Sequence, residues 1–117
     1  MNRDDFIKEF KSDISFTEDE RQRIIRNMVF IGGADTECVV SMEEMAELQQ
    51  QISKFIRGTG DRVSLLEEMA DVYICLDMLM YIYGIDADEM QKAIDVKLKR
   101  NFEWQIKGDY LDGRNYN

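Results

Sequence analysis

The stretch VYICLDMLMYIY, residues 72 to 83, decides the fold, because it is apolar at every position except Asp77. A surface helix of a globular protein has one apolar face, whereas this stretch is apolar all round. A monomer of 117 residues has one modest core and would struggle to cover such a helix on every side. We therefore expect a homo-oligomer, a dimer or a tetramer, that forms through this helix. The alternative is a central helix that its own chain wraps completely.

The rest of the chain also has the apolar spacing of helices. It contains no proline and seven glycines, so it has few helix breakers. The predicted helices cover, in order, about Asp4–Phe10, Glu18–Ile31, Met42–Arg57, Ser64–Tyr83 and Ala87–Ile106. Capping boxes are expected at Thr17 with Glu20, Ser41 with Glu44, Ser64 with Glu67, and Asp86 with Glu89. The pattern predicts an all-α antiparallel bundle of four to five helices, with one domain over residues 1–106 and a polar tail at 107–117.

Composition excludes several classes of function. The net charge of −9 argues against binding a nucleic-acid polymer, and the absence of histidine excludes Ser-His-Asp and Cys-His catalysis and histidine-based zinc sites. Cys38 and Cys75 lie in apolar segments, which fits a reducing compartment. There is no apolar signal region, and the richest apolar run is too short to span a bilayer. We expect a cytoplasmic protein without membrane association.

Two pairs of acidic residues stand three positions apart on consecutive predicted helices. Glu44 and Glu47 share one face of the third helix. Glu68 and Asp71 share one face of the fourth. The short connection GTGD, residues 58 to 61, makes the two helices antiparallel neighbours. The pair midpoints lie about 13 and about 10 residues from this turn, so their heights differ by about one helical turn. Four carboxylates should therefore converge, and such an all-oxygen site suits Mg²⁺, with Mn²⁺ as a substitute.

Helical phase places the acidic residues of the third helix at the edge of its apolar stripe. Glu44 falls beside that stripe, Glu47 falls further round, and Glu43 points to solvent. A single acidic pair is common in a chain with 24 acidic residues, so the prediction rests on two pairs at matched heights. The stripe that we expect to be buried consists of Met45, Leu48, Ile52, Phe55 and Ile56.

These residues also carry a resemblance to a known family. EEMAE, residues 43 to 47, and EMADVYICLDML, which begins at Glu68, resemble the E-x-x-E and E-x-x-D motifs of the MazG-like all-α nucleoside triphosphate pyrophosphohydrolases. Dimeric dUTPases and phosphoribosyl-ATP pyrophosphohydrolases belong to the same superfamily. That pattern continues with a lysine and an asparagine four residues apart, and KLKRN supplies Lys97 and Asn101. The resemblance covers residues 42–101, about half of the chain.

The resemblance implies an Mg²⁺-dependent enzyme that cleaves a nucleoside triphosphate between the α and β phosphates. The metal ligands and catalytic carboxylates would be Glu44, Glu47, Glu68 and Asp71, and one glutamate would also orient or deprotonate the attacking water. The phosphate-binding residues would be Lys97 and Asn101, with Lys54 and Arg100 as weaker candidates.

Two other readings stay open at this point. The first is a non-catalytic helical oligomer that binds a nucleotide or a protein as a regulatory module, with its acidic residues forming a solvated face. The second is a metal-buffering bundle without turnover. Asp77 is expected to pair with a basic residue across a helix or subunit contact. Neither the base nor the sugar of the substrate follows from the sequence.

Overall fold

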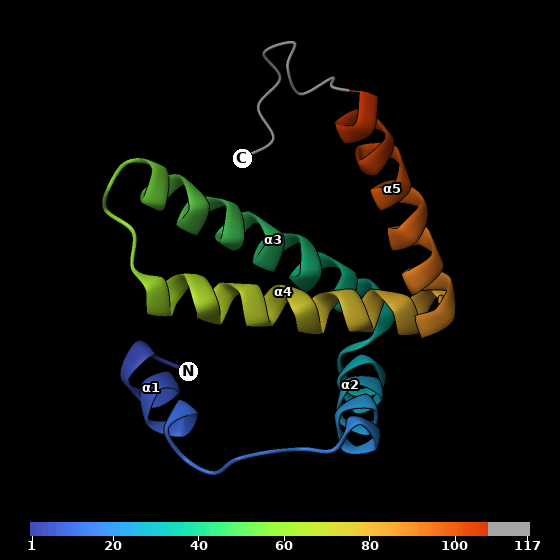
Figure 1. Cartoon of the computed structure of the whole chain (residues 1–117). Helices are drawn as coiled ribbons and strands as arrows, with labels where there is room; N and C mark the ends of the chain where they lie inside the picture. The colour runs from blue at the N-terminus through green and yellow to red at the C-terminus, as the bar shows by residue number, and fades with distance from the viewer. Residues whose placement is uncertain (108–117) are drawn as a thin grey trace. The chain divides into compact units, whose positions relative to one another are not determined.

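The computed structural model describes residues 1–107 of the chain. The prediction of an all-α fold is confirmed, because the described residues form α-helices joined by short connections (Figure 1). The helices are α1 (Arg3–Phe10), α2 (Glu18–Gly32), α3 (Ala34–Ile56), α4 (Arg62–Tyr83) and α5 (Ala87–Lys107). They fall into two compact units, one formed by Met1–Tyr83 and the other beginning at Gly84 with α5. No helix within residues 1–107 is long and apolar enough to cross a membrane.

Two of the four predicted capping boxes are confirmed. At the start of α2, the Glu20 amide donates to Thr17 Oγ1 at 3.1 Å, and the Thr17 amide donates back to the Glu20 carboxylate at 2.9 Å. Asp86 and Glu89 make the same reciprocal pair before α5. Each pair satisfies amide groups that a helix start would otherwise leave without an acceptor.

The other two predicted caps are wrong, because both helices begin earlier. Gly33, at φ 88°, ends α2 and allows α3 to begin immediately at Ala34. Ser41 is consequently buried in the middle of α3, where its hydroxyl donates to the carbonyl of Glu37 at 2.8 Å. At α4 the cap is Asp61, whose carboxylate accepts from the Ser64 amide at 3.2 Å and from the Ser64 hydroxyl at 2.7 Å.

The core of the first unit is small. Helices α3 and α4 run side by side and antiparallel, and α2 packs against both (Figure 1). The buried apolar side chains are Ile25 and Val29 of α2 and Cys75 and Met78 of α4, with Ile82 packed against them. The predicted burial of the α3 stripe is wrong for Ile52, Phe55 and Ile56, which are 47%, 42% and 82% exposed, whereas Met45 and Leu48 are half-buried. These three residues lie outside the buried cluster that α2 and α4 form within Met1–Tyr83.

Helix α1 belongs to the first unit, where it packs against α4 and forms an ion pair with the residue that precedes α4. Arg3 donates from Nε and Nη2 to the two carboxylate oxygens of Asp61, at 2.9 and 3.2 Å. No residue of α1 is buried, and the rings of Phe6 and Phe10 stack on each other instead of entering the core. Phe6 and Ile7 are half-buried, whereas the Arg3–Asp61 pair is exposed to solvent, and such pairs contribute little to stability.

Asp77 has no ion-pair partner within residues 1–107. Burial raises the pKa of its carboxyl group, and the negative charge of Glu18 on α2 raises it further. The expected basic partner is therefore not supplied by the described part of this chain.

Candidate metal site

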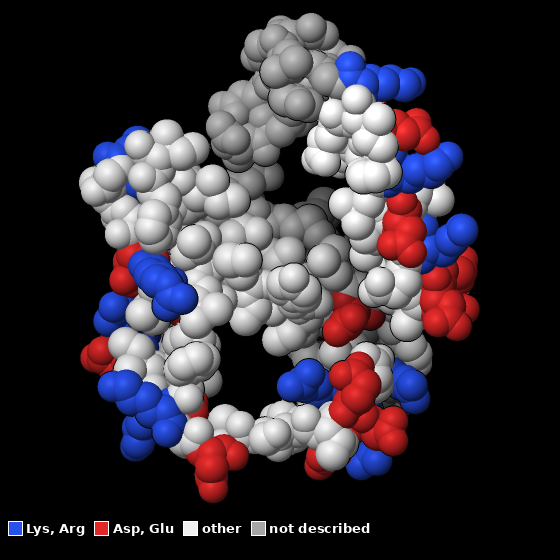
Figure 2. All heavy atoms as spheres, viewed as in Figure 1, with Lys and Arg blue, Asp and Glu red and all other residues white. Residues whose placement is uncertain are grey.

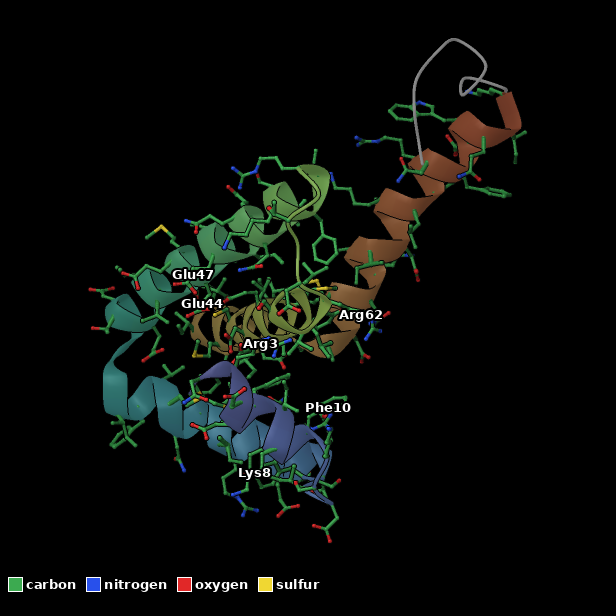
Figure 3. All side chains as sticks on the ribbon, turned by 90° about the vertical axis from the view of Figure 1, so that its left-hand side faces the viewer. Arg3, Lys8, Phe10, Glu44, Glu47 and Arg62 are labelled. Carbon is green, nitrogen blue, oxygen red and sulfur yellow. The ribbon has the colours of Figure 1, made fainter. Side chains whose placement is uncertain are left out.

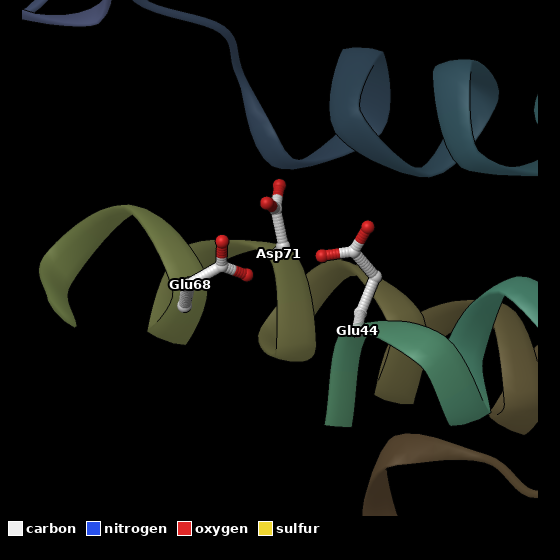
Figure 4. A group of neighbouring side chains, drawn as sticks. All are labelled: Glu44, Glu68 and Asp71. Atoms are coloured by element: carbon white, nitrogen blue, oxygen red, sulfur yellow. The ribbon is translucent and has the colours of Figure 1, made fainter. Parts of the chain in front are cut away.

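Three carboxylate side chains meet where α3 packs against α4. Glu44 comes from α3, and Glu68 and Asp71 come from successive turns of α4 (Figure 4). One oxygen from each lies within 4.8 Å of the other two. We refer to these three residues as the acidic cluster. Glu68 and Asp71 share one face of α4 because they are three residues apart. The antiparallel packing of α3 against α4 brings Glu44 to the same place, as expected from the distance of each acidic pair from the turn.

The carboxylates of the acidic cluster are poorly hydrated. Oε2 of Glu44 and Oε2 of Glu68 are shielded from solvent, and neither has a hydrogen-bond donor within the described part of the chain. A carboxylate oxygen removed from water without a donor carries a desolvation cost, so native proteins normally satisfy it. Within residues 1–107, neither oxygen therefore has the hydrogen-bond donor that would stabilise it.

Electrostatics within the acidic cluster favour protonation when no cation is present. Burial, followed by the negative charges of Asp71, Glu47 and Glu68, raises the pKa of Glu44 from 4.5 to about 7. Burial is also the main cause that raises the pKa values of Glu68 and Asp71. A dication among the three groups would favour their charged forms and reverse these shifts.

The fourth predicted ligand, Glu47, lies beside the acidic cluster and not within the group of three. Its charge still contributes to the raised pKa values of Glu44, Glu68 and Asp71. Glu47 is more exposed to solvent than Glu44, in agreement with its expected position further round α3. It is therefore close enough to influence a ligand at the cluster while remaining open to water.

The predicted phosphate-binding residues are divided between the two units. Lys54 lies on α3, seven residues beyond Glu47, and its side chain forms no ion pair within residues 1–107. Lys97, Arg100 and Asn101 lie on α5, in the unit that begins at Gly84. The structure thus brings together three of the predicted carboxylates and leaves the predicted phosphate-binding residues as a separate hypothesis.

Two neighbours of the acidic cluster were not assigned to it from the sequence. Ser41 is buried at 1% exposure, and Cys75 at 2%. The Cys75 thiol is near enough to be influenced by the Ser41 hydroxyl and by the charges of Glu44 and Asp71, while burial is the main cause that raises its pKa. Ser41 is three residues before Glu44, and Cys75 is four residues after Asp71, so helical spacing alone indicates their proximity.

The donor set of the acidic cluster fits a small, hard dication. All three groups offer oxygen, which Mg²⁺ and Mn²⁺ prefer over softer metals. Ligand oxygens around Mg²⁺ stand about 3 to 4 Å apart, given bonds of about 2.1 Å in an octahedron. Oxygens already within 4.8 Å of one another need only small side-chain movements to reach that spacing.

The comparisons with known proteins identify no relative. No family model matches the chain, and no match is found among curated proteins or among solved structures. The interpretation of the acidic cluster therefore rests on its residues and their geometry.

Proposed function

We propose that the protein is an Mg²⁺-dependent nucleotide pyrophosphohydrolase, which converts a nucleoside triphosphate and water into a nucleoside monophosphate and pyrophosphate. The observation that carries the proposal is the pair of shielded carboxylate oxygens on Glu44 and Glu68, which have no donor within residues 1–107, in a cluster of three carboxylates with oxygens within 4.8 Å of one another. The type of reaction is inferred from the resemblance to the MazG-like family, and the acidic cluster is the proposed binding site of the metal.

The bound metal would neutralise charge on the phosphate oxygens and lower the pKa of a coordinated water. Glu44, Glu68 and Asp71 hold it in this proposal, because their oxygens already lie within 4.8 Å of one another. Three carboxylates leave coordination positions for water and for two phosphate groups of the substrate. The ligands come from two packed helices, so their separation is set by rigid elements.

We propose that Glu47 orients and deprotonates the attacking water. It lies next to the acidic cluster but outside its three ligands, and it remains accessible to solvent. A carboxylate in that position accepts a hydrogen bond from the water and takes its proton as the new bond to the α phosphorus forms. The bond from the α phosphorus to the bridging oxygen breaks, and pyrophosphate leaves with the electron pair.

The experiment is a product analysis with a panel of nucleoside and deoxynucleoside triphosphates in Mg²⁺ and H₂¹⁸O. We expect at least one substrate to give monophosphate and pyrophosphate, with ¹⁸O in the monophosphate because water attacks the α phosphorus. EDTA should abolish turnover. Diphosphate with orthophosphate as products, or no turnover across the panel, would refute the proposal.

Substitutions separate the assigned roles. Glu44→Gln is expected to abolish turnover and weaken Mg²⁺ binding, since it removes a ligand with a shielded oxygen. Glu47→Gln is expected to lower kcat by about 10²- to 10⁴-fold with little change in Mg²⁺ affinity, as for loss of a general base. The matched control is Glu43→Gln, at an exposed position on the same helix. A loss of activity in Glu43→Gln equal to that in Glu44→Gln would contradict the assignment.

A further inference from the structure

Helices α3 and α4 are in buried contact about one helical turn away from the acidic cluster. Of the α3 residues, all of which the structure describes, Ser41 is the one that is buried, at 1% exposure. Cys75 of α4 is 2% exposed. Burial raises the pKa of the Cys75 thiol and the Ser41 hydroxyl opposes this rise, so the two side chains lie next to each other. Each has a single heavy atom beyond Cβ, and the separation of packed helices depends on the side chains between them.

This contact and the acidic cluster share one antiparallel register. Glu44 lies three residues after Ser41 on α3, and Asp71 lies four residues before Cys75 on α4. The two steps cover about 4.5 and about 6 Å along their helices, so the pair of ligands follows the pair of small residues by about one turn on both sides. Figure 3 shows Glu44 and the next acidic residue, Glu47, on successive turns of α3. Because helices are rigid, a change of separation at Ser41 and Cys75 is transmitted to the cluster.

Side-chain packing, and not the pairing of charges, sets the separation of the two helices. Within residues 1–107 there is no ion pair between α3 and α4. The side-chain hydrogen bond between them in this range joins Cys38 Sγ and the Tyr83 hydroxyl at 3.6 Å. The Ser41 hydroxyl donates within α3, to the carbonyl of Glu37. Figure 2 shows mostly uncharged side chains over the middle of the two helices. The volume of the side chains between α3 and α4 therefore controls how far apart they stand.

The separation of the helices matters because dications differ in size. Mg²⁺ requires a nearly ideal octahedron with bonds of about 2.1 Å, whereas Ca²⁺ accepts flexible geometry with bonds of about 2.3 to 2.6 Å. The oxygens of the acidic cluster come from both helices and lie within 4.8 Å of one another. A wider separation of α3 and α4 would move the Glu44 oxygens away from those of Glu68 and Asp71. Such a site would lose the spacing that Mg²⁺ needs before it lost the spacing that Ca²⁺ tolerates.

We propose that Ser41 and Cys75 are positioning residues, whose small buried side chains hold α3 and α4 at the separation that makes the acidic cluster selective for Mg²⁺ over Ca²⁺. Neither residue contacts the metal in this proposal, and both act through Glu44 and Asp71. The inference rests on the metal site of the proposed function, but it is independent of the nucleotide and of the bond that is cleaved. It assigns the choice of cation to the buried volume behind the ligands, in addition to the charge of the ligands themselves.

The test is calorimetric titration of the full-length protein with Mg²⁺ alone and with Ca²⁺ alone. Ser41→Val places two methyl groups where the hydroxyl stood and should lower Mg²⁺ affinity by about 10- to 100-fold, the usual effect of changing a group behind a metal ligand. Ca²⁺ affinity should fall much less, so the ratio of the two affinities changes. Ser41→Ala is the matched control, because it removes the hydroxyl without adding volume, and it should retain both affinities. Combining Ser41→Val with Cys75→Ala makes room between the helices and should restore the ratio.

Two further variants separate positioning from general stability. Val29→Ile adds a methylene group to the same core from α2 and should leave the affinity ratio unchanged. Ser41→Thr adds one methyl group, keeps the hydroxyl and should move the ratio in the same direction as Ser41→Val, so the test does not depend on the folding of the larger variant.

The outcomes distinguish this inference from the proposed function. If the unmodified protein binds neither cation, the metal site is wrong and the inference falls with it. If the unmodified protein binds Mg²⁺ but the Ser41 variants lower both affinities equally, the metal site stands and the positioning role is refuted. A ratio that changes as much in Val29→Ile as in Ser41→Val would also refute it.

Discussion

Replacing Glu44 with glutamine should stabilise the metal-free protein above neutral pH, although it removes a proposed metal ligand. The pKa of Glu44 is raised from 4.5 to about 7, mainly by burial and then by the charges of Asp71, Glu47 and Glu68. Between these two values the folded state binds more protons than the unfolded state, so the free energy of unfolding falls as pH rises. The stabilisation is complete below pH 4.5 and lost once the pH passes about 7. Glutamine carries no charge and avoids this loss.

The expected size follows from the same shift. The rise of the Glu44 pKa from 4.5 to about 7 corresponds to about 3 kcal/mol, at about 1.36 kcal/mol per pKa unit. Because the carboxyl group is partly open to water, solvent screening reduces this to about 1 kcal/mol. For a domain of this length, about 1 kcal/mol raises Tm by about 5 °C. We therefore expect Glu44→Gln to raise Tm by about 5 °C at pH 8 in EDTA and to leave it unchanged at pH 4.

Addition of Mg²⁺ should make the unmodified protein more stable than Glu44→Gln, the reverse of the order in EDTA. At a concentration 100 times its Kd, a ligand that binds only the folded state stabilises it by about 2.7 kcal/mol. The unmodified protein should gain this stabilisation, and Glu44→Gln should gain much less. Thermal unfolding at fixed protein concentration in EDTA and in Mg²⁺ measures both effects, with Glu43→Gln as the control at an exposed neighbouring position. A lower Tm for Glu44→Gln in EDTA at pH 8, or an equal rise for Glu43→Gln, would refute the reasoning.

Three further predictions concern the scaffold. Thr17→Ala should cost about 1 kcal/mol in unfolding free energy, measured by urea denaturation, because α2 loses its cap. Met78→Ala should cost about 2 to 5 kcal/mol in the same assay, since it opens a cavity in a small core, whereas Phe30→Ala, at an 87% exposed position, should change little. Arg3→Gln should speed amide hydrogen exchange in α1, because within residues 1–107 the side-chain hydrogen bonds from α1 to the rest of the first unit run from Arg3 to Asp61. Unchanged exchange in α1 would show that its packing against α4 holds the helix.

Helix positions were predictable from the sequence where a breaker and a cap occur together. Thr17 follows the non-helical connection after α1, and Asp86 follows the end of α4 at Tyr83. Both are confirmed as caps. Ser41 has the same sequence signature without a preceding break, and Ser64 lies three residues after the break at residues 58–61, where Asp61 takes the cap instead. Residues 34–40 contain neither glycine nor proline, so α3 continues through them and the Ser41 hydroxyl bonds back to Glu37. A cap therefore requires evidence that the residue before it is not helical.

The acidic cluster was predictable because it depends only on helix pitch and one short turn. Glu44, Glu68 and Asp71 meet as their distances from residues 58–61 require. Burial of the α3 stripe was not predictable in the same way, because an apolar stripe does not reveal what covers it. The apolar spacing of Ile52 and Ile56 is real, but within the single chain both remain exposed. Periodicity identifies a buried face without distinguishing burial by the same chain from burial by another.

The α3–α4 hairpin has two features that cost stability, one on each side. On one side, charges of equal sign crowd together, with two carboxylate oxygens that lack a donor. On the other side, large apolar residues remain in water, among them Tyr73. The buried core within residues 1–107 is small, and a domain has only a small margin of stability. A dication bound on the first side and a partner bound on the second would each stabilise the folded state and so add to the free energy of unfolding. Because Tyr73 lies on the opposite side of α4 from Glu68 and Asp71 at 100° per residue, the two contributions should add with little coupling, so that a metal and a partner would stabilise the same hairpin independently.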